Sequence, residues 1–331
     1  MKVSWLGVAL TYVGAVVGAG FASGQEIYQF FGRYGQSGIV GIAVAGSLFG
    51  VLGYLALERG RRGQTGGFVS LWASWYPAWL IRVAEGVTTA FLVIGLGVVS
   101  SGGGAAINQT AGAPRLLGAL VTTVAVVLVV ASGTRSVVRA NALLIPYLIV
   151  MVLMIGVLNW PHPTVSRPAA PPGQWLMSAL LYLSYNIFTG IMVLLGVGRT
   201  LTSRSQTGLA AFLGAAVLSL LAFVEHHTLT TLPAIGALPL VDAAARTHRA
   251  LAILFGLCLW VALFTTGVAE AYALREQYGS PILWLIMVTF LFGLLSFDRL
   301  VQVLYPAMGM VAVLLWIPLV YRGPKRGVPG G

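Results

Sequence analysis

Long apolar stretches separated by short polar ones run from one end of the chain to the other. A helix needs ~20 apolar residues to cross a hydrocarbon core ~30 Å thick. Ten stretches reach or approach this length, at about 4–31, 37–57, 79–101, 115–132, 137–158, 175–198, 207–224, 250–274, 280–297 and 300–321. Because lipid offers no hydrogen bonds to the backbone, such stretches form helices. The pattern predicts an all-α polytopic membrane protein with ten transmembrane helices in a single domain, 1–331.

The composition is typical of a membrane protein, and in such a protein the net positive charge reports the topology. Of 331 residues, 58% are hydrophobic and 8% are charged, and the mean hydropathy is +0.91. A net charge of +11 would suggest nucleic acid for a soluble protein, but here the charges follow the topology. With the N-terminus inside, twelve basic residues lie on the inner side and six on the outer side. We therefore expect a cell-membrane protein with both termini cytoplasmic, a short tail at 323–331, lipid as its surroundings and no nucleic-acid partner.

Two apolar spans are interrupted by small and polar residues at corresponding places. The first contains GAGFASG at 18–24 and the sixth contains SYNIFTG at 184–190, about half the chain apart. An unwound segment is tolerated at membrane depth only where protein packs around it or water reaches it, and its exposed ends suit an anion and a cation. Five spans per half is an odd number, so the halves are expected to be inverted repeats, about 1–160 and 170–322. Helices 1 and 6 are predicted to be broken around a midplane site.

The residues of both interruptions resemble those of a known superfamily. The run Gly14 to Phe21, GAVVGAGF, resembles the signature of the broken first helix in the amino acid, polyamine and organocation transporters, and 185–190, YNIFTG, is similar to their sixth-helix pattern. The longer string GAGFASGQE resembles the YkvI-type bacterial membrane proteins. The resemblance implies a LeuT-like fold of two inverted five-helix repeats. It also implies a substrate between helices 1 and 6, often with a coupling Na⁺ or H⁺, and no other cofactor or metal is expected.

The same resemblance assigns roles to individual positions. The amides of the first break would bind a substrate carboxylate, the carbonyls of the sixth-helix break would bind an amine, and Phe188 would be a lid or wall. The candidate substrate-binding residues are Gly18, Ala19, Gly20, Phe21, Ser23, Tyr185, Asn186, Phe188, Thr189 and Gly190. The candidate coupling residues are Val17, Glu26, Thr265, Thr266 and Glu270.

Several of the coupling candidates have a structural alternative. Threonines in membrane helices commonly donate to their own preceding carbonyls, which would account for Thr265 and Thr266. Glu270 could take a proton or gate an inner vestibule, or it could pair with Arg275. After the first break the helix is expected to restart near Ser23. Ser23 and Glu26 have the S-x-x-E spacing of a capping box, so Glu26 is either a helix cap or a coupling residue.

A short polar run, Glu225, His226 and His227, ends the seventh span. Adjacent histidines without a third ligand at metal-binding spacing are more typical of a surface than of a metal or pH site. We therefore expect these three residues to be ordinary surface residues at the edge of a loop.

No catalytic motif of the kind H-E-x-x-H, G-x-S-x-G or a Walker P-loop occurs, so an enzyme is not expected. The sequence predicts a secondary active transporter of a small amino acid or related zwitterion, coupled to Na⁺ or H⁺, working by alternating access. The alternative is a membrane ligand sensor that uses the same pocket without net transport. A channel is disfavoured because no filter motif is present. The substrate's side chain, the coupling ion, the direction of transport and the oligomeric state are left open.

Overall fold

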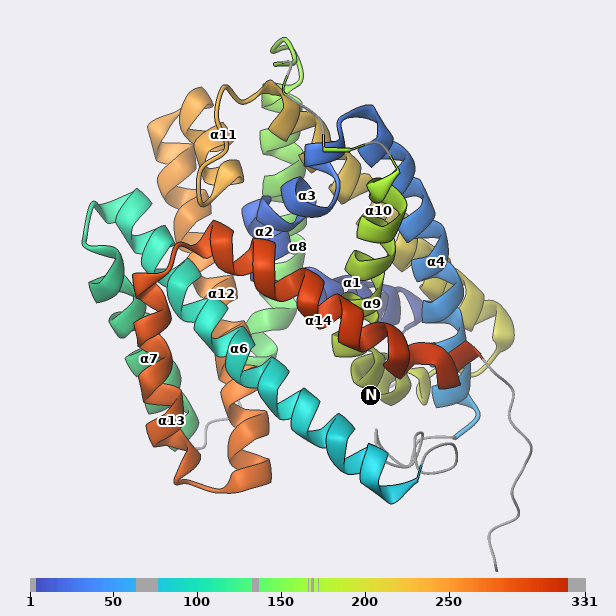
Figure 1. Cartoon of the computed structure of the whole chain (residues 1–331). Coiled ribbons are helices and arrows are strands. Elements are labelled where there is room, and N and C mark those ends of the chain that lie inside the picture. Colours follow the sequence, from blue (N-terminus) through green and yellow to red (C-terminus); the bar gives the residue numbers. More distant parts are fainter. Residues whose placement is uncertain are drawn as a thin grey trace, which may run out of the picture.

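The computed structural model describes residues 4–63, 77–132, 137–165, 167, 170–171 and 173–320, and this part of the chain is helical with no strand (Figure 1). The first half contains α1 (Trp5–Val16), α2 (Ala19–Ser23), α3 (Gln25–Phe30), η1 (Gly32–Tyr34), α4 (Gln36–Arg61), α6 (Ala78–Ala111), α7 (Arg115–Ser132) and α8 (Val137–Asn159). The second contains α9 (Gln174–Gly198), α10 (Arg204–Thr231), α11 (Pro239–Thr247), α12 (Arg249–Tyr278), α13 (Ile282–Val288), η2 (Thr289–Leu294) and α14 (Phe297–Val320). The predicted tail at 323–331 lies outside the described residues.

Many of these helices have the length and apolar character of membrane spans. Within the described ranges, five qualify singly: α4, α6, α7, α10 and α12. The segment of α13 and η2 qualifies together with α14, although the chain bends by 118° between them. The protein is therefore a multi-pass membrane protein, while the count of ten spans stays a prediction.

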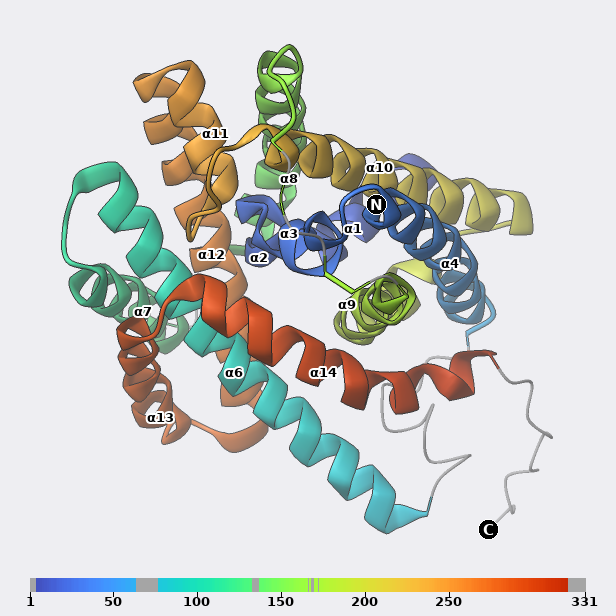
Figure 2. The ribbon, with the colours of Figure 1, turned by 45° about the horizontal axis from the view of Figure 1, so that its top comes forward.

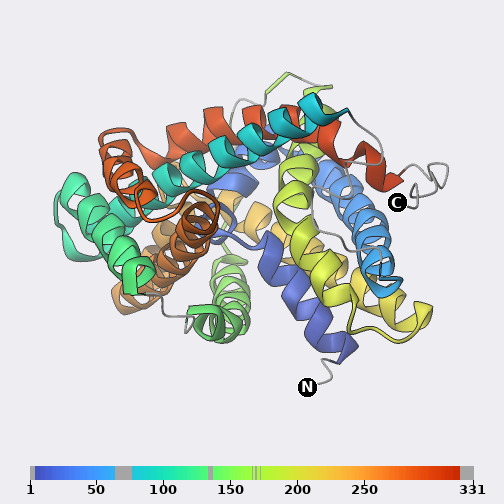
Figure 3. The ribbon, with the colours of Figure 1, turned by 90° about the horizontal axis from the view of Figure 1, so that it is seen from below.

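The first helix and the pair α2 and α3 lie at the centre of the bundle (Figure 1). Helix α1 packs against α8, α9 and α10, and α4 packs against α9 and α10. Helix α6 packs against α7, α12 and α14, and Figure 2 shows α6 and α14 crossing the same face side by side. From below, α1 and α9 lie next to each other (Figure 3). The two segments predicted to hold a substrate are therefore neighbours at the centre.

Small residues allow close contact where α4 crosses α9. A Cβ added at Gly60 or at Gly198 would lie 3.1 Å from the Cα of the other glycine. In a bilayer there is no hydrophobic force between helices, so close van der Waals contact of this kind holds them together.

The first span changes direction twice. Helix α1 ends at Val16, Gly18 has extended geometry with ψ −171°, and α2 begins at Ala19. A second change occurs at Gly24, whose φ of +82° favours glycine. A Cβ at Gly24 would also lie 2.9 Å from the side chain of Leu240 in α11, so this joint packs against α11. The helix thus restarts at Ala19, earlier than the restart near Ser23 that the sequence suggested.

The predicted break in the sixth span is wrong. Helix α9 is continuous from Gln174 to Gly198 and includes all of 184–190. The polar side chains that suggested a break bond the helix's own backbone instead: Asn186 Nδ2 donates to the Tyr182 carbonyl at 3.0 Å, and Thr189 Oγ1 donates to the carbonyl of Asn186 at 3.0 Å. Side chains that satisfy preceding carbonyls in this way are compatible with an unbroken membrane helix.

Candidate functional site

Glu26 connects the broken first span to α9. It lies on α3, its side chain is buried with 3% exposure, and its carboxyl group accepts a hydrogen bond from the Tyr185 hydroxyl of α9. The carboxyl group also accepts from the backbone N–H of Phe21 in α2. The Glu26 side chain therefore connects α3, on which it lies, to α2 and to α9.

The Glu26 side chain folds back over Gly20. A Cβ at Gly20 would overlap the Cγ, Cδ and Oε1 atoms of Glu26, so only glycine leaves room for the carboxyl group there. By contrast, a Cβ at Gly18 would meet nothing within 4 Å. The place where the resemblance puts a substrate carboxylate, against the amides of this segment, thus holds a carboxyl group of the protein itself.

The capping box, one of the two alternatives for Glu26, does not form. Ser23 Oγ donates to the carbonyl of Gly20 at 2.7 Å and accepts from the N–H of Gln25 at 3.1 Å, rather than from the N–H of Glu26. Helix α3 has Gly24 as its N-cap, with no side-chain cap. Because Glu26 reaches toward Gly20 and Tyr185, its role is not that of a reciprocal cap for Ser23.

Aromatic rings surround the Glu26 carboxyl group. The Tyr185 ring lies 5.8 Å from that of Phe30, 5.9 Å from Tyr182 and 5.0 Å from Tyr305 of α14, measured between centroids. Tyr305 in turn lies within electrostatic reach of both Glu26 and Glu270. These rings exclude water from the carboxyl group while supplying polarisable faces and hydroxyl groups.

A cavity of about 320 Å³ opens one helical turn beyond Glu26, where α3, α9 and α14 meet. Its lining residues are Gln29, Phe30, Arg33, Tyr34, Gln174, Met177, Ser178, Leu181, Gln302 and Pro306. Phe30 belongs both to this lining and to the ring cluster around Tyr185, so the cavity adjoins the rings near Glu26.

Of the other residues predicted from α9, Asn186, Phe188 and Gly190 are buried, whereas Thr189 is exposed. Phe188 packs edge to face against Phe91 of α6, with centroids 5.1 Å apart, and is thus a wall between the two helices. Gly190 faces α1, since a Cβ there would lie 3.7 Å from the Cβ of Ala15. The structure therefore brings the predicted first and sixth segments together, although α9 offers no unwound carbonyls for an amine.

The two threonines of α12 that were predicted to bind a coupling cation bond their own helix instead. The hydroxyl groups of Thr265 and Thr266 donate to the Ala262 carbonyl at 3.0 and 2.9 Å, as threonines in membrane helices commonly do. Val17 is buried next to the first break. Glu270 does not pair with Arg275, whose guanidinium bonds the carbonyls of 130–131 at the end of α7. Instead the Glu270 carboxyl group packs where a Cβ on Gly95 of α6 would lie, and its Oε2 has no hydrogen-bond partner.

The prediction that Glu225 and its neighbours lie on the surface is wrong. Helix α10 continues to Thr231, two turns past the predicted end of the seventh span. This extension leaves Glu225 with 0% exposure and His226 with 3%. His227 stacks against Trp160, with ring centroids 4.0 Å apart. The sequence signal that was missed is the lack of any glycine or proline between Gly214 and Pro233, which lets the helix continue past the histidines.

Known proteins resemble this chain over nearly its whole length, although no family model matches it. The uncharacterized membrane protein YkvI of Bacillus subtilis is 26% identical over 336 residues, which cover 96% of each chain. Among solved structures, the inward-facing conformation of Mhp1 aligns with a TM-score of 0.71, 14% identity and coverage of 96% of this chain and 76% of that chain. The fold is LeuT-like. MhsT, solved in complex with L-phenylalanine, agrees with a TM-score of 0.65, 18% identity and coverage of 96% and 89%. The resemblance to YkvI-type membrane proteins and to LeuT-fold transporters is thereby confirmed over nearly the whole chain.

Proposed function

We propose that the protein is a secondary active transporter of a small amine-bearing molecule, such as a small amino acid or related zwitterion. The site would lie between the broken first span and α9, and access to it would alternate between the two sides of the membrane. The observation that carries the proposal is the buried Glu26 carboxyl group, shared between Tyr185 of α9 and the Phe21 amide beside the break.

The chemistry of this position favours recognition of a cationic group. Once ionised, a carboxylate in a water-poor site binds an ammonium group strongly, because low local polarity strengthens the attraction. The neighbouring rings of Tyr185 and Tyr305 add cation–π surfaces. A substrate carboxylate would have to displace Glu26 from the Phe21 amide, so we expect the amine to contribute more to affinity than the carboxylate.

The relatives support a transporter. Mhp1 and MhsT share the fold, and MhsT was solved with an amino acid. We further propose that both termini are cytoplasmic and that the helices form two inverted five-helix repeats, as the sequence pattern implies. Transport would be coupled to Na⁺ or H⁺, as the resemblance implies.

The test begins with a thermal-shift screen of the purified protein against amino acids, amines and betaines, in Na⁺ and in K⁺ and at several pH values. A ligand raises the melting temperature with the logarithm of its concentration over its dissociation constant. Each hit is then assayed for uptake into proteoliposomes, with Glu26→Gln as the variant and the exposed Glu276→Gln as the matched control. We expect uptake by wild type and by the control and its loss in Glu26→Gln.

Two outcomes would contradict the proposal. Ligand stabilisation without uptake would indicate a sensor, and undiminished uptake by Glu26→Gln would remove Glu26 from the site.

A further inference from the structure

Glu225 of α10 is a second buried carboxyl group, and the site at Glu26 does not include it. Its side chain has 0% exposure, and neither carboxyl oxygen has a hydrogen-bond partner. Buried polar groups are nearly always paired, so this one points to a ligand that the protein atoms do not supply.

The carboxyl group faces the broken first span. Leu229 lies one turn after Glu225 on the same face of α10, and its Cδ2 would be 3.5 Å from a Cβ on Gly24. The next residue along α3, Gln25, is 1% exposed, and its Oε1 is also without a partner. Glu26 lies within electrostatic reach of Glu225. Two unpaired groups, one from α10 and one from α3, thus flank the same joint.

Among the residues that the structure describes, few charged or titratable groups of the helices packed against α10 lie near Glu225. Glu26 of α3 lies within electrostatic reach of Glu225, and Tyr182 of α9 lies within reach of both carboxyl groups. On α10 itself, the adjacent His226 is buried, and its Nδ1 has no partner.

On α10 the next residue, His227, stacks against Trp160 and has an Nε2 without a partner. Other titratable groups of the surrounding elements are engaged elsewhere or exposed. Among them are Tyr12 of α1, bonded to the Phe49 carbonyl; Glu58 of α4, paired with Arg61 and Arg62; Arg33 of η1, over the Tyr34 ring; Asp242 of α11, bonded to Gln109; Arg246 of α11, bonded to the Thr231 carbonyl; and the exposed Tyr147 of α8.

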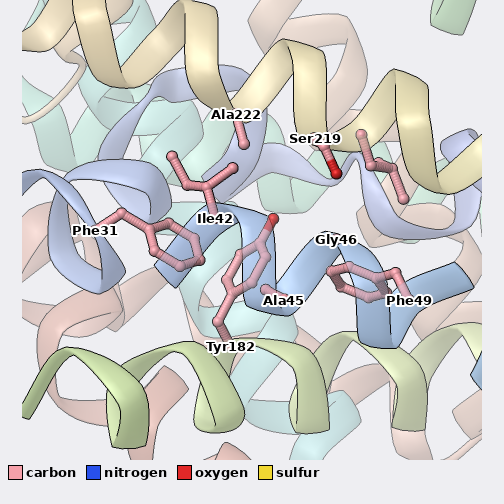
Figure 4. Close-up of a pocket in the computed structure, with 9 residues that line it drawn as sticks. Phe31, Ile42, Ala45, Gly46, Phe49, Tyr182, Ser219 and Ala222 are labelled. Atoms are coloured by element: carbon pink, nitrogen blue, oxygen red, sulfur yellow. The ribbon is translucent and has the colours of Figure 1, made fainter. Parts of the chain in front are cut away.

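Tyr182 and a small void lie one turn from Glu225. Figure 4 shows Tyr182 rising from α9 toward α10, beside Ile42 and Ala45 of α4 and below Ala222. The void they line has a volume of about 10 Å³, close to the space that one water molecule occupies. A space of this size holds at most one water molecule and is too small for a substrate.

The occupant of Glu225 follows from its surroundings. A carboxylate without a donor or cation in a protein interior takes up a proton or a cation, because an isolated buried charge is too costly. A transition metal such as Zn²⁺ needs several His, Cys, Asp or Glu ligands, and no group of three such residues suited to a metal occurs in the part of the chain that the structure describes. A proton needs a single oxygen, and the neighbouring Glu26 disfavours a second negative charge.

We propose that Glu225 is a proton-binding residue. One H⁺ binds to its carboxyl group, and that proton leaves when a substrate cation occupies Glu26. The proposal rests on the proposed function and names H⁺ as the coupling ion. Binding forms one O–H bond on Glu225 and consumes one proton, and release returns the carboxylate. Occupation of Glu26 by a substrate cation lowers the repulsion between the two carboxylates and so permits Glu225 to lose its proton.

The test is infrared spectroscopy of the full chain in lipid nanodiscs at neutral pH, which needs no substrate. A protonated carboxyl group has a C=O stretch separate from that of a carboxylate, and it shifts when H₂O is exchanged for D₂O. The difference spectrum between wild type and Glu225→Gln should show the loss of one such band. The control Glu276→Gln, at an exposed position, should lose none. Glu225→Leu gives the same comparison should the glutamine variant not fold.

Three results would overturn the proposal. The first is a carboxyl band unchanged in both Glu225 variants. The second is a band that Na⁺ abolishes at constant pH, because the occupant would then be Na⁺. The third is substrate uptake by Glu225→Gln that keeps the pH dependence of wild type. If the infrared test fails while wild type takes up substrate, only the proton site is rejected. If wild type takes up no substrate at all, the proposed transporter function is rejected.

Discussion

Replacement of Gly20 by alanine tests the arrangement around Glu26 most directly. The new Cβ would overlap three atoms of the Glu26 side chain, so the side chain has to leave its position. It would then lose the hydrogen bonds from the Tyr185 hydroxyl and from the Phe21 amide. The matched control is Gly18→Ala, where the Cβ would meet nothing within 4 Å and the backbone is extended.

The size of the effect follows from these contacts. Each hydrogen bond contributes a net ~1 kcal/mol, and forcing a side chain out of a packed interior costs ~1–3 kcal/mol. Alanine recovers ~0.5–1 kcal/mol because it is a better helix former than glycine. We therefore expect Gly20→Ala to lower the free energy of unfolding by about 2–4 kcal/mol. Gly18→Ala should be neutral or stabilising by up to ~1 kcal/mol.

The assay is thermal or denaturant unfolding of the purified variants, combined in a double-mutant cycle with Glu26→Ala. Alanine at position 26 removes all three clashing atoms, so most of the cost of Gly20→Ala should disappear in that background. Equal stability of Gly20→Ala and Gly18→Ala, or an undiminished cost in the Glu26→Ala background, would refute the reasoning.

Three further predictions follow from other contacts. Glu26→Gln should fold but bind a screened ligand more weakly, as read by thermal shift, because the amide carries no charge to pair with an ammonium group; unchanged affinity would restrict Glu26 to structure. Tyr185→Phe keeps the ring but removes the hydroxyl donor, so ligand affinity should fall about tenfold, the equivalent of one hydrogen bond; equal titration curves for wild type and variant would contradict this. Gly60→Ala places a Cβ against the backbone carbonyl of Leu195 and should abolish monodisperse protein on size exclusion, whereas Gly86→Ala, with open space around it, should not; a stable Gly60→Ala protein would refute the close crossing.

The sequence predicted the helical fold well because lipid imposes a simple rule: long apolar runs form helices. It also located the first break, since Gly18, Gly20 and Gly24 are unusual in number and spacing there. The exact path could not be predicted. A string of small residues does not show whether the helix restarts at Ala19 or near Ser23, because the packing of Glu26 and α11 decides it.

The errors concern polar residues, whose partners depend on packing. Asn186 and Thr189 suggested a break but satisfy carbonyls of their own helix. Glu225 and His226 suggested a surface but are covered because α10 extends beyond them. Hydropathy counts polarity and cannot show which neighbour a side chain meets, so the buried carboxyl groups became evident only from the arrangement of α3, α9 and α10.

The joint at Gly24 gives α11 a mechanical connection to the centre of the protein. The Leu240 side chain fills the space beside this glycine, where any other residue would carry its own side chain. If α11 lifted away, it would leave a void at the joint and remove the support that fixes the angle between α2 and α3. Because Glu26 lies two residues further on, a movement of α11 would turn the carboxyl group relative to Tyr185. A helix that contacts no part of the carboxyl group can in this way control its direction.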